Sequence, residues 1–431
     1  MDEWITTTLG ELIARGDGKL QTGPFGTVLK ASEYTLTGVP VVSVGEIQIG
    51  RVHVSGRTPR VSVATKQRLP QFVLEEGDIV FGRKGGIDRN ALIGSREKGW
   101  FLGSDGIRLR LCERVDSTFV SYQFRLRAVG KWLLGNSAGS IMPSLNEGML
   151  GRLPLRLPQL KDQQEIAAVL SALDAKIDLN NNINAELEAL AKTIYDYWFV
   201  QFDFPDTNGR PYKTSGGKMV WNEVLKREIP AGWEAKSLGS VISRTGTGLN
   251  PRDNFVLGTG SNYYVTIKNV TNGRIVLDDK CDRIDDESMA IIDRRSQLRA
   301  GDVLFTSIEP VGVTYLIHEK PTNWNINESV FTIRPDTDVI TSEYLLMLLS
   351  SSEMKAFTKN SSAGSIHKGI RHGVLKSFNL PYAGKKLIDQ FSSMMRPMLQ
   401  KMHCLDRENR ELTQLRDWLL PLLMNGQVRV A

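Results

Sequence analysis

Two stretches of the chain carry apolar residues at alternating spacings of three and four positions. The first begins at Ile166 and continues to Trp198, and the second runs from Phe391 to Leu412. This spacing averages about 3.5 residues and keeps one helix face toward a partner, as in a coiled coil. The predicted seam of the helix pair comprises Ile166, Leu170, Leu173, Ile177, Asn180, Asn184, Leu187, Ile194, Phe391, Met395, Met398, Met402, Leu405, Asn409 and Leu412.

The length of the first predicted helix bears on how it is used. Amphipathic helices usually lie on their own domain, but a helix over residues 160–199 would be about 60 Å long, longer than a domain of about 160 residues is wide. We therefore expect it to extend beyond its domain and to pair with the second helix. Because the chain leads out along one helix and must return along the other, the pair is predicted to be antiparallel. Asparagines in the seam would fix its register at a cost in stability, and Pro397 predicts a kink or a late start in the second helix.

Between the helices the chain consists of short apolar runs broken by Gly, Pro, Asn and Asp, which predicts α+β domains. Three patterns recur in the same order about 225 positions apart. The segments 4–13, 77–81 and 137–141 recur at 233–242, 301–305 and 362–366. Matches in register at nearly one offset indicate a duplicated domain. The predicted divisions are 1–159 for the first domain, 160–208 for a helix and linker, 209–384 for the second domain and 385–431 for the C-terminal helix.

Charge is sorted along these segments. The whole chain has 54 basic and 48 acidic side chains, a net charge of +6, but residues 160–208 hold three basic and nine acidic ones. The two long domains are therefore positive and suit a polyanion, whereas the central segment suits a protein partner. With three cysteines there is no disulfide framework, and no apolar run is long enough to span a bilayer. We expect a cytoplasmic protein with no membrane contact.

The sequence lacks several common catalytic motifs. It contains no Gly-x4-Gly-Lys-Ser/Thr phosphate loop, no Gly-x-Gly-x-x-Gly opening a helix, and no Pro-Pro pair of the kind found in adenine methyltransferases. We predict no catalytic and no metal-binding residue. Two alternatives stay open: a methyltransferase or nuclease with unrecognisable motifs, and a scaffold that binds only proteins.

Several segments are more particular than these patterns: 21–26 (QTGPFG), 193–205 (TIYDYWFVQFDFP), 208–212 (NGRPY), 229–233 (IPAGW) and 415–426 (LRDWLLPLLMNG). With them the chain closely resembles, over its whole length, the specificity subunit of Type I restriction-modification systems. The resemblance implies two homologous α/β target-recognition domains separated by a long antiparallel two-helix coiled coil, with pseudo-two-fold symmetry.

The resemblance also implies a function. Such a subunit is not an enzyme. Each recognition domain reads one half of a bipartite, asymmetric site in double-stranded DNA, and the helices dock two modification (methyltransferase) subunits, which restriction subunits join. S-adenosylmethionine is then bound by the modification subunits, and ATP with Mg²⁺ by the restriction subunits, so that this chain binds no cofactor itself.

Candidate DNA-binding residues follow from side-chain chemistry. Basic and amide side chains read base edges or hold phosphates, and glycines around residues 83–89 let a basic loop approach DNA closely. The alternative is that these side chains are merely solvated. The candidates are Arg83, Lys84 and Arg89 in the first domain and Lys268, Asn269, Asn272, Arg274, Lys368 and Arg371 in the second.

Candidate partner-binding residues lie on the first helix. Its acidic surface would be repelled by phosphate, and its aromatic residues serve either a partner contact or ordinary packing in the seam. The candidates are Asp174, Asp178, Glu186, Tyr195, Tyr197 and Trp198.

Overall fold

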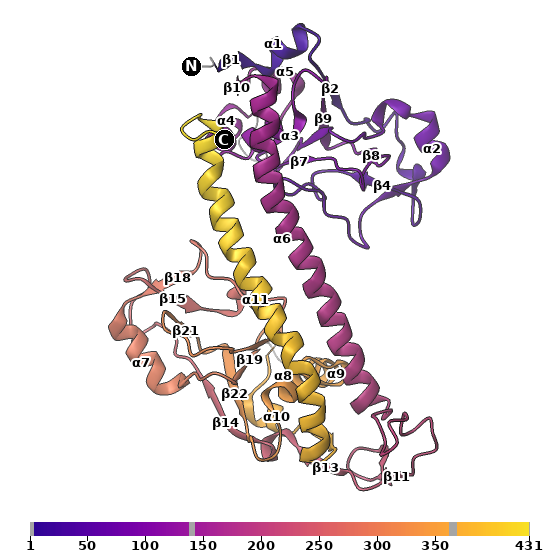
Figure 1. Cartoon of the computed structure of the whole chain (residues 1–431), viewed down its shortest axis with the longest axis vertical. Helices are drawn as coiled ribbons and strands as arrows, with labels where there is room; N and C mark the ends of the chain where they lie inside the picture. The colour runs from indigo at the N-terminus through magenta and orange to yellow at the C-terminus, as the bar shows by residue number, and fades with distance from the viewer. Residues whose placement is uncertain (1–3, 138–142, 362–368, 431) are drawn as a thin grey trace. The chain divides into compact units, whose positions relative to one another are not determined.

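The computed structural model describes residues 4–137, 143–361 and 369–430. Two sequence predictions, Lys368 and most of the repeated segment 137–141/362–366, lie outside these residues. The chain forms two compact units, Met1–Leu179 with Asn409–Ala431 and Asn180–Glu408. Each unit joins one α/β domain to part of both long helices, α6 (Leu160–Tyr195) and α11 (Lys385–Met424) (Figure 1).

The domain of the first unit is built on two four-stranded sheets, with strand orders β2-β9-β6-β7 and β3-β5-β4-β8. The first sheet is antiparallel, β4 and β8 run parallel, and β1 pairs with β10 in a separate ribbon. The strands are β1 Ile5–Thr8, β2 Gly18–Thr22, β3 Tyr34–Thr35, β4 Val39–Val42, β5 Arg60–Val61, β6 Ile79–Gly82, β7 Asn90–Leu92, β8 Phe101–Leu102, β9 Gly106–Leu111 and β10 Pro154–Leu157. The helices are α1 Leu9–Ala14, α2 Val63–Arg68, α3 Ser117–Phe124, α4 Arg127–Asn136 and α5 Glu147–Gly151.

The domain of the second unit repeats this topology. Its antiparallel sheet has the order β14-β22-β19-β20, its second sheet β18-β15-β21 again contains a parallel pair, and β13 pairs with β23 as β1 does with β10. The strands are β11 Met219–Asn222, β12 Arg227–Pro230, β13 Glu234–Ser237, β14 Ile242–Thr247, β15 Asn262–Val265, β16 Val270–Thr271, β17 Arg274–Ile275, β18 Asp282–Ile284, β19 Val303–Thr306, β20 Thr314–Leu316, β21 Trp324–Ile326, β22 Val330–Pro335 and β23 Asn379–Tyr382. The helices are α7 Asp286–Ser296, α8 Ser342–Ser350, α9 Ser352–Ser361 and α10 His372–Lys376. Two α/β domains of one topology confirm the predicted duplication.

The repeated Gly-Asp pair has the same structural role in both domains. Gly77 and Gly301 turn the chain with φ of 87° and 88°, a conformation that favours glycine. The buried carboxylate that follows each glycine accepts two hydrogen bonds from one arginine, at 2.7 Å each for Asp78 and Arg110 and at 2.7 and 2.8 Å for Asp302 and Arg334. A bidentate pair of this kind fixes the strand entry against the neighbouring strand.

The long helices pack together in each unit. In the first unit Ile166 and Leu170 share a hydrophobic cluster with Leu420 and Leu423. In the second, the Nδ2 atoms of Asn180 and Asn184 donate to Glu408 Oε2 at 2.9 Å and Asp406 Oδ1 at 2.7 Å. The residue numbers along α11 decrease as those along α6 increase, so the two helices run antiparallel in this unit, as predicted.

The seam residues are buried or half-buried in the helix pair. The buried ones are Ile166, Leu170, Asn180, Asn184, Phe391, Met395 and Leu405, and the half-buried ones are Leu173, Ile177, Leu187, Ile194, Met398, Met402, Asn409 and Leu412. Pro397 does not mark a late start, because α11 begins at Lys385 and continues through it. The proline is exposed while nearby Met395 and Leu399 are buried, so packing of the inner face offsets the missing backbone donor. None of the helices in the described ranges is both long and apolar enough to cross a membrane.

Candidate nucleic-acid interface

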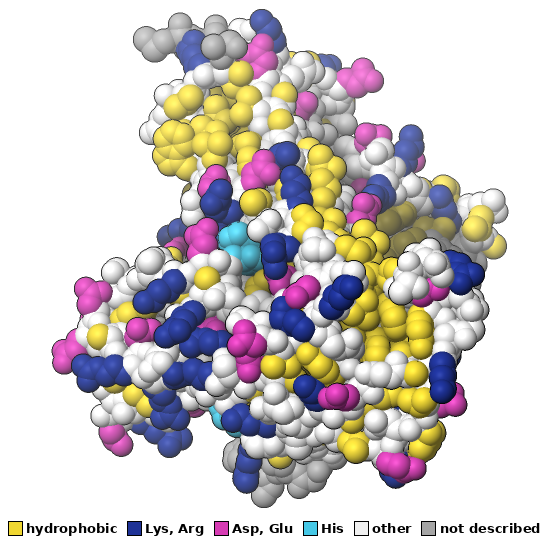
Figure 2. Space-filling model, turned by 60° about the horizontal axis from the view of Figure 1, so that its bottom comes forward, with side chains coloured by type: hydrophobic (Ala, Val, Ile, Leu, Met, Phe, Trp, Pro, Cys, Tyr) yellow, Lys and Arg dark blue, Asp and Glu magenta, His cyan; other side chains and the backbone are white. Residues whose placement is uncertain are grey.

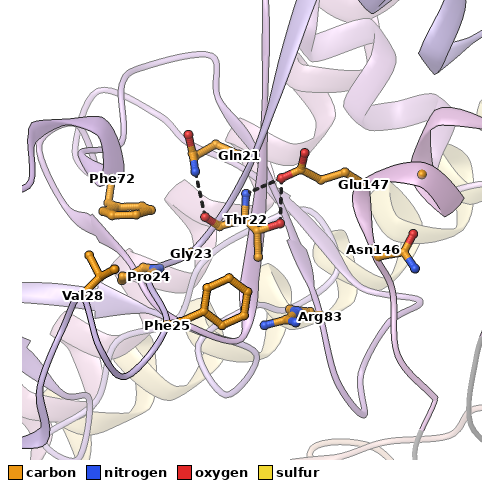
Figure 3. Close-up of a pocket in the computed structure, with 11 residues that line it drawn as sticks. Gln21, Thr22, Gly23, Pro24, Phe25, Val28, Phe72, Arg83, Asn146 and Glu147 are labelled. Atoms are coloured by element: carbon orange, nitrogen blue, oxygen red, sulfur yellow. Dashed lines mark hydrogen bonds between the residues drawn. The ribbon is translucent and has the colours of Figure 1, made fainter.

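A groove of about 520 Å³ lies at the end of β2 in the first domain. It is formed by the loop that follows this strand, by Phe72, by Arg83 and by the start of α5 (Figure 3). The loop is the segment 21–26 on which the family resemblance partly rests. We call this cavity the first groove.

Backbone packing fixes the loop at the floor of the first groove. A Cβ atom on Gly23 would lie 1.8 Å from the carbonyl oxygen of Gly103, so only glycine fits. Beside it Thr22 donates from its backbone nitrogen at 2.8 Å and from its hydroxyl at 2.7 Å to Glu147 Oε1. Glu147 opens α5, where Asn146 Oδ1 caps the helix by accepting from the nitrogen of Met149 at 2.8 Å.

The basic loop after β6 brings one of its three predicted side chains into the first groove. The Arg83 guanidinium carbon lies 4.9 Å from the centroid of the Phe25 ring, in cation–π geometry. Phe25 is 55% exposed, so its ring and the Arg83 guanidinium border the groove together. Lys84 and Arg89 are exposed on the same loop and do not line the groove.

The second domain has the same backbone arrangement at the end of β14. A Cβ on Gly248 would lie 1.6 Å from the carbonyl oxygen of Ile326, as Gly23 lies against Gly103. Arg371 is the residue before α10, the place that Asn146 has before α5. In the first domain the loop after β6 forms an isolated β-bridge between Lys84 and Ser144. In the second domain the loop after β19 forms the corresponding bridge between Ile308 and Gly369.

Different side chains occupy this second surface. His372 stands where Glu147 stands in the first groove, and its ring stacks on Phe331 at 3.8 Å between centroids. Burial, followed by the charges of Lys376 and Arg295, lowers the pKa of His372. Arg295, in the last turn of α7, donates from Nε to Thr247 Oγ1 at 3.1 Å. We call the surface formed by Thr247, Gly248, Arg295, Arg371 and His372 the second surface.

Sequence reasoning missed Arg295. Figure 2 shows Lys and Arg side chains gathered over the lobe that carries α7, β15 and β18, and the last turn of α7 contains Arg294 and Arg295. The available signal was the Thr-Gly pair at 22–23 and at 247–248, which falls at the repeat offset. It locates the end of β14, but α7 comes about 40 residues later in the chain, and the sequence does not place it beside that strand.

The other predicted residues of the second domain lie near the helices. Arg274, in β17, forms an ion pair with Asp406 of α11 at 2.8 Å. Asn269 Oδ1 accepts from the nitrogen of Thr266 at 2.9 Å and so closes a turn. Lys268 is exposed in the turn before β16, and Asn272 is exposed in the β16–β17 hairpin. The structure therefore does not bring this group together with Arg371, and a DNA contact by these residues stays a prediction.

The candidate partner residues on α6 differ in accessibility. Asp174 accepts from the Tyr122 hydroxyl at 2.7 Å and from Arg125 and Arg416 at 2.8 Å each. Burial alone would raise its pKa, but the hydrogen bonds from Tyr122 and Arg416 and the charge of Arg125 keep the pKa below its ordinary value. Asp174 is thus held by its own unit.

Of the remaining candidates, Tyr195 and Trp198 are buried in the core of the second unit. These two residues therefore serve packing, the alternative to a partner contact. Asp178 is exposed and pairs with Arg51 at 3.4 Å. Glu186 and Tyr197 are exposed and accessible to a partner. In the described part of the chain no group of three metal-ligating side chains comes together.

Residues 1–189 match the family model described as the Type I restriction modification DNA specificity domain. The MjaIX specificity subunit of Methanocaldococcus jannaschii is 25% identical over 327 residues, covering 73% of this chain and 70% of that protein. The HindI specificity subunit of Haemophilus influenzae is 23% identical over 344 residues, covering 69% and 73%.

The fold itself is found in a crystal structure of the Type I restriction-modification S subunit from M. genitalium. Its TM-score is 0.61 with 17% identity, and the match covers 98% of this chain and 96% of that one. The duplicated α/β domains with paired long helices share the fold of that S subunit. Residues 1–189 thus match a Type I specificity domain, and the chain is similar over about 70% of its length to the specificity subunits of two Type I restriction enzymes.

Proposed function

We propose that each domain reads one half of a bipartite, asymmetric site in double-stranded DNA, through the first groove and the second surface. The observation that carries the proposal is the recurrence of one backbone arrangement with different side chains. Gly23 and Gly248 hold the same close approach to a neighbouring backbone, while Glu147 is replaced by His372. One backbone arrangement with different surrounding side chains suits two domains that recognise different base sequences.

The charges around both sites suit DNA. Arg83, Lys84 and Arg89 belong to one loop at the first groove. Arg295 and Arg371 belong to the second surface, and Arg244 reaches it by donating to the Arg295 carbonyl at 2.8 Å. Basic side chains of this kind hold phosphates and donate to guanine edges.

The helix pair then sets the distance between the two half-sites and recruits the catalytic subunits. Joining two weak readers by a stiff spacer makes the second contact intramolecular, so affinity rises only where the half-site spacing matches the spacer. We propose that the exposed acidic and aromatic positions of α6, including Glu186 and Tyr197, contribute to docking two modification subunits, which restriction subunits join. S-adenosylmethionine would be bound by the former, and ATP with Mg²⁺ by the latter.

The test is a map of methylated adenines in a host that carries this chain with its modification subunits. Arg83→Ala is expected to relax base preference in one half of the methylated sequence, and Arg295→Ala in the other. Arg127→Ala, an exposed arginine of α4 away from the groove, is the matched control and should leave the sequence unchanged. Equal relaxation of both halves by either groove variant, or none by both, would contradict the assignment of one domain to each half.

A further inference from the structure

The first groove contains an acidic side chain, which is unfavourable beside a polyanion. Among the residues that line it, the charged ones are Arg83 and Glu147. A carboxylate is repelled by phosphate and by the acceptor atoms of base edges. Its presence in a DNA-binding groove therefore calls for a donor on the DNA.

The position of this carboxylate is fixed from one side. Both hydrogen bonds from Thr22 end on Glu147 Oε1. Figure 3 shows the second oxygen pointing away from Thr22, and among the described residues it has no hydrogen-bond donor. One oxygen is thus held by the protein while the other is left to accept from a bound molecule.

Base chemistry narrows the choice of donor. In the major groove the exocyclic amines of cytosine and adenine are the donors, and acidic side chains pair with cytosine N4. The adenine amine is also a donor, but it lies next to the N7 acceptor. A carboxylate placed at the adenine amine would therefore be repelled by N7. Guanine and thymine present O6, N7 and O4 acceptors, so a carboxylate also discriminates against them by repulsion.

Arg83 supplies the complementary half of this chemistry. An arginine fork pairs with guanine O6 and N7, the commonest specific contact. The Phe25 ring lies against its guanidinium at 4.9 Å and restricts where that fork can point.

We propose that Glu147 and Arg83 select a G·C base pair in the half-site of the first domain, with Glu147 Oε2 accepting from cytosine N4 and Arg83 donating to guanine. This rests on the proposed function. The second surface is an internal comparison, because His372 and Arg371 replace Glu147 and Asn146 there. It lacks the acceptor carboxylate and should not make this selection.

The experiment is methylation mapping with Glu147→Gln and Glu147→Ala in the presence of the modification subunits. One cytosine position of the first half-site should lose about 10-fold or more of its discrimination against other bases, the size of one good base contact. Glu113→Gln is the matched control, because Glu113 is an exposed glutamate of the first domain that does not line the groove, so the preference should remain.

Two outcomes overturn the inference: a first half-site without any G·C pair, or the same cytosine preference in both Glu147 variants. If Arg83→Ala relaxes the first half-site while the Glu147 variants do not, the proposed function stands and this inference fails. If the variants do not assemble, the wild-type complex is tested on duplexes in which 7-deazaguanine replaces each guanine in turn. Binding should weaken about 10-fold at one guanine of the first half-site, and equal binding at every position overturns the inference.

Discussion

The two domains share the buried contacts that hold the central sheet, which we call the frame. They differ in the side chains around the first groove and the second surface, which we call the rim. In both, a Gly-Asp turn, a bidentate arginine and a glycine pressed against a neighbouring carbonyl hold the central sheet. At the rim, Phe25, Arg83 and Glu147 of the first groove contrast with Arg295 and His372 of the second surface. The contacts that hold the fold are therefore shared by the two domains, and the side chains around the opening differ.

The two kinds of position also differ in how much stability a substitution costs. Residues that hold the frame contact backbone atoms or buried partners, so a substitution there costs folding free energy. Phe25 and Arg83 lie against each other at the opening of the first groove, so a substitution there should cost little stability. Glu147 and His372 also contact the fold, through the Thr22 backbone and the Phe331 ring.

The largest expected effect is the loss of a frame carboxylate. Asp302→Ala would leave the Arg334 guanidinium without its partner in a site where that side chain is 18% exposed. We expect a loss of about 3–5 kcal/mol in the free energy of unfolding. Asp78→Ala should cost less, because the Arg110 side chain is 41% exposed and can reach water. Urea denaturation followed by circular dichroism measures both.

A double variant sharpens this prediction. Asp302→Ala combined with Arg334→Met removes the unpaired charge and should recover part of the lost stability. If Asp78→Ala is as costly as Asp302→Ala, or if the double variant is less stable than the single one, burial of the arginine is not what sets the cost.

The next effect concerns the close approaches at Gly23 and Gly248. Alanine at either position would overlap a backbone oxygen, at 1.8 and 1.6 Å, and the strand must shift to relieve it. We expect each variant to lose about 3 kcal/mol, at the upper end of the range for overpacking. The melting temperature, measured by calorimetry, reports this loss.

Two nearby glycines serve as matched controls. A Cβ atom on Gly26 or Gly373 would meet nothing within 4 Å, so Gly26→Ala and Gly373→Ala should change stability little. A control variant as unstable as Gly23→Ala would show that the loop, and not the contact with Gly103, limits stability.

The sequence predicted the parts of the fold that depend on local periodicity. The helix seam follows from spacings of three and four, because a helix buries one face whatever its partner is. The duplication follows from Gly77 and Gly301, since a positive φ confines the position to glycine. Both signals lie within a few residues of the structure they predict.

Long-range partners were not predictable in this way. Arg295 reaches Thr247 through the packing of α7 against β14, and Arg274 turns to Asp406 on a helix more than 100 residues away in the chain. Asp174 looked like a free acidic residue, yet it pairs with Arg416 near the end of the chain. These contacts depend on the tertiary arrangement, which single-sequence patterns do not contain.

The smallest expected effect is a pH dependence confined to the second unit. His318 follows β20 and stacks on His403 of α11 at 4.1 Å between centroids, whereas Gly94 holds the matching place after β7. Burial, with the charge of His403, lowers the pKa of His318 to about 4 from its ordinary value of 6.5. The unfolded chain therefore binds the proton more readily between these values, and stability should fall as the pH drops from 6.5 toward 4.

We expect the melting temperature of the second unit to drop by about 2–4 °C more between pH 7 and pH 5 in the wild type than in His318→Phe. Hydrogen exchange assigns the change to a unit, because peptides around β20 and α11 should open first in acid while those around β7 do not. His53→Asn, at an exposed histidine of the first unit, should leave the pH profile unchanged. If His318→Phe keeps the acid sensitivity of the wild type, the histidine stack is not its source, and the two domains differ at their rims alone.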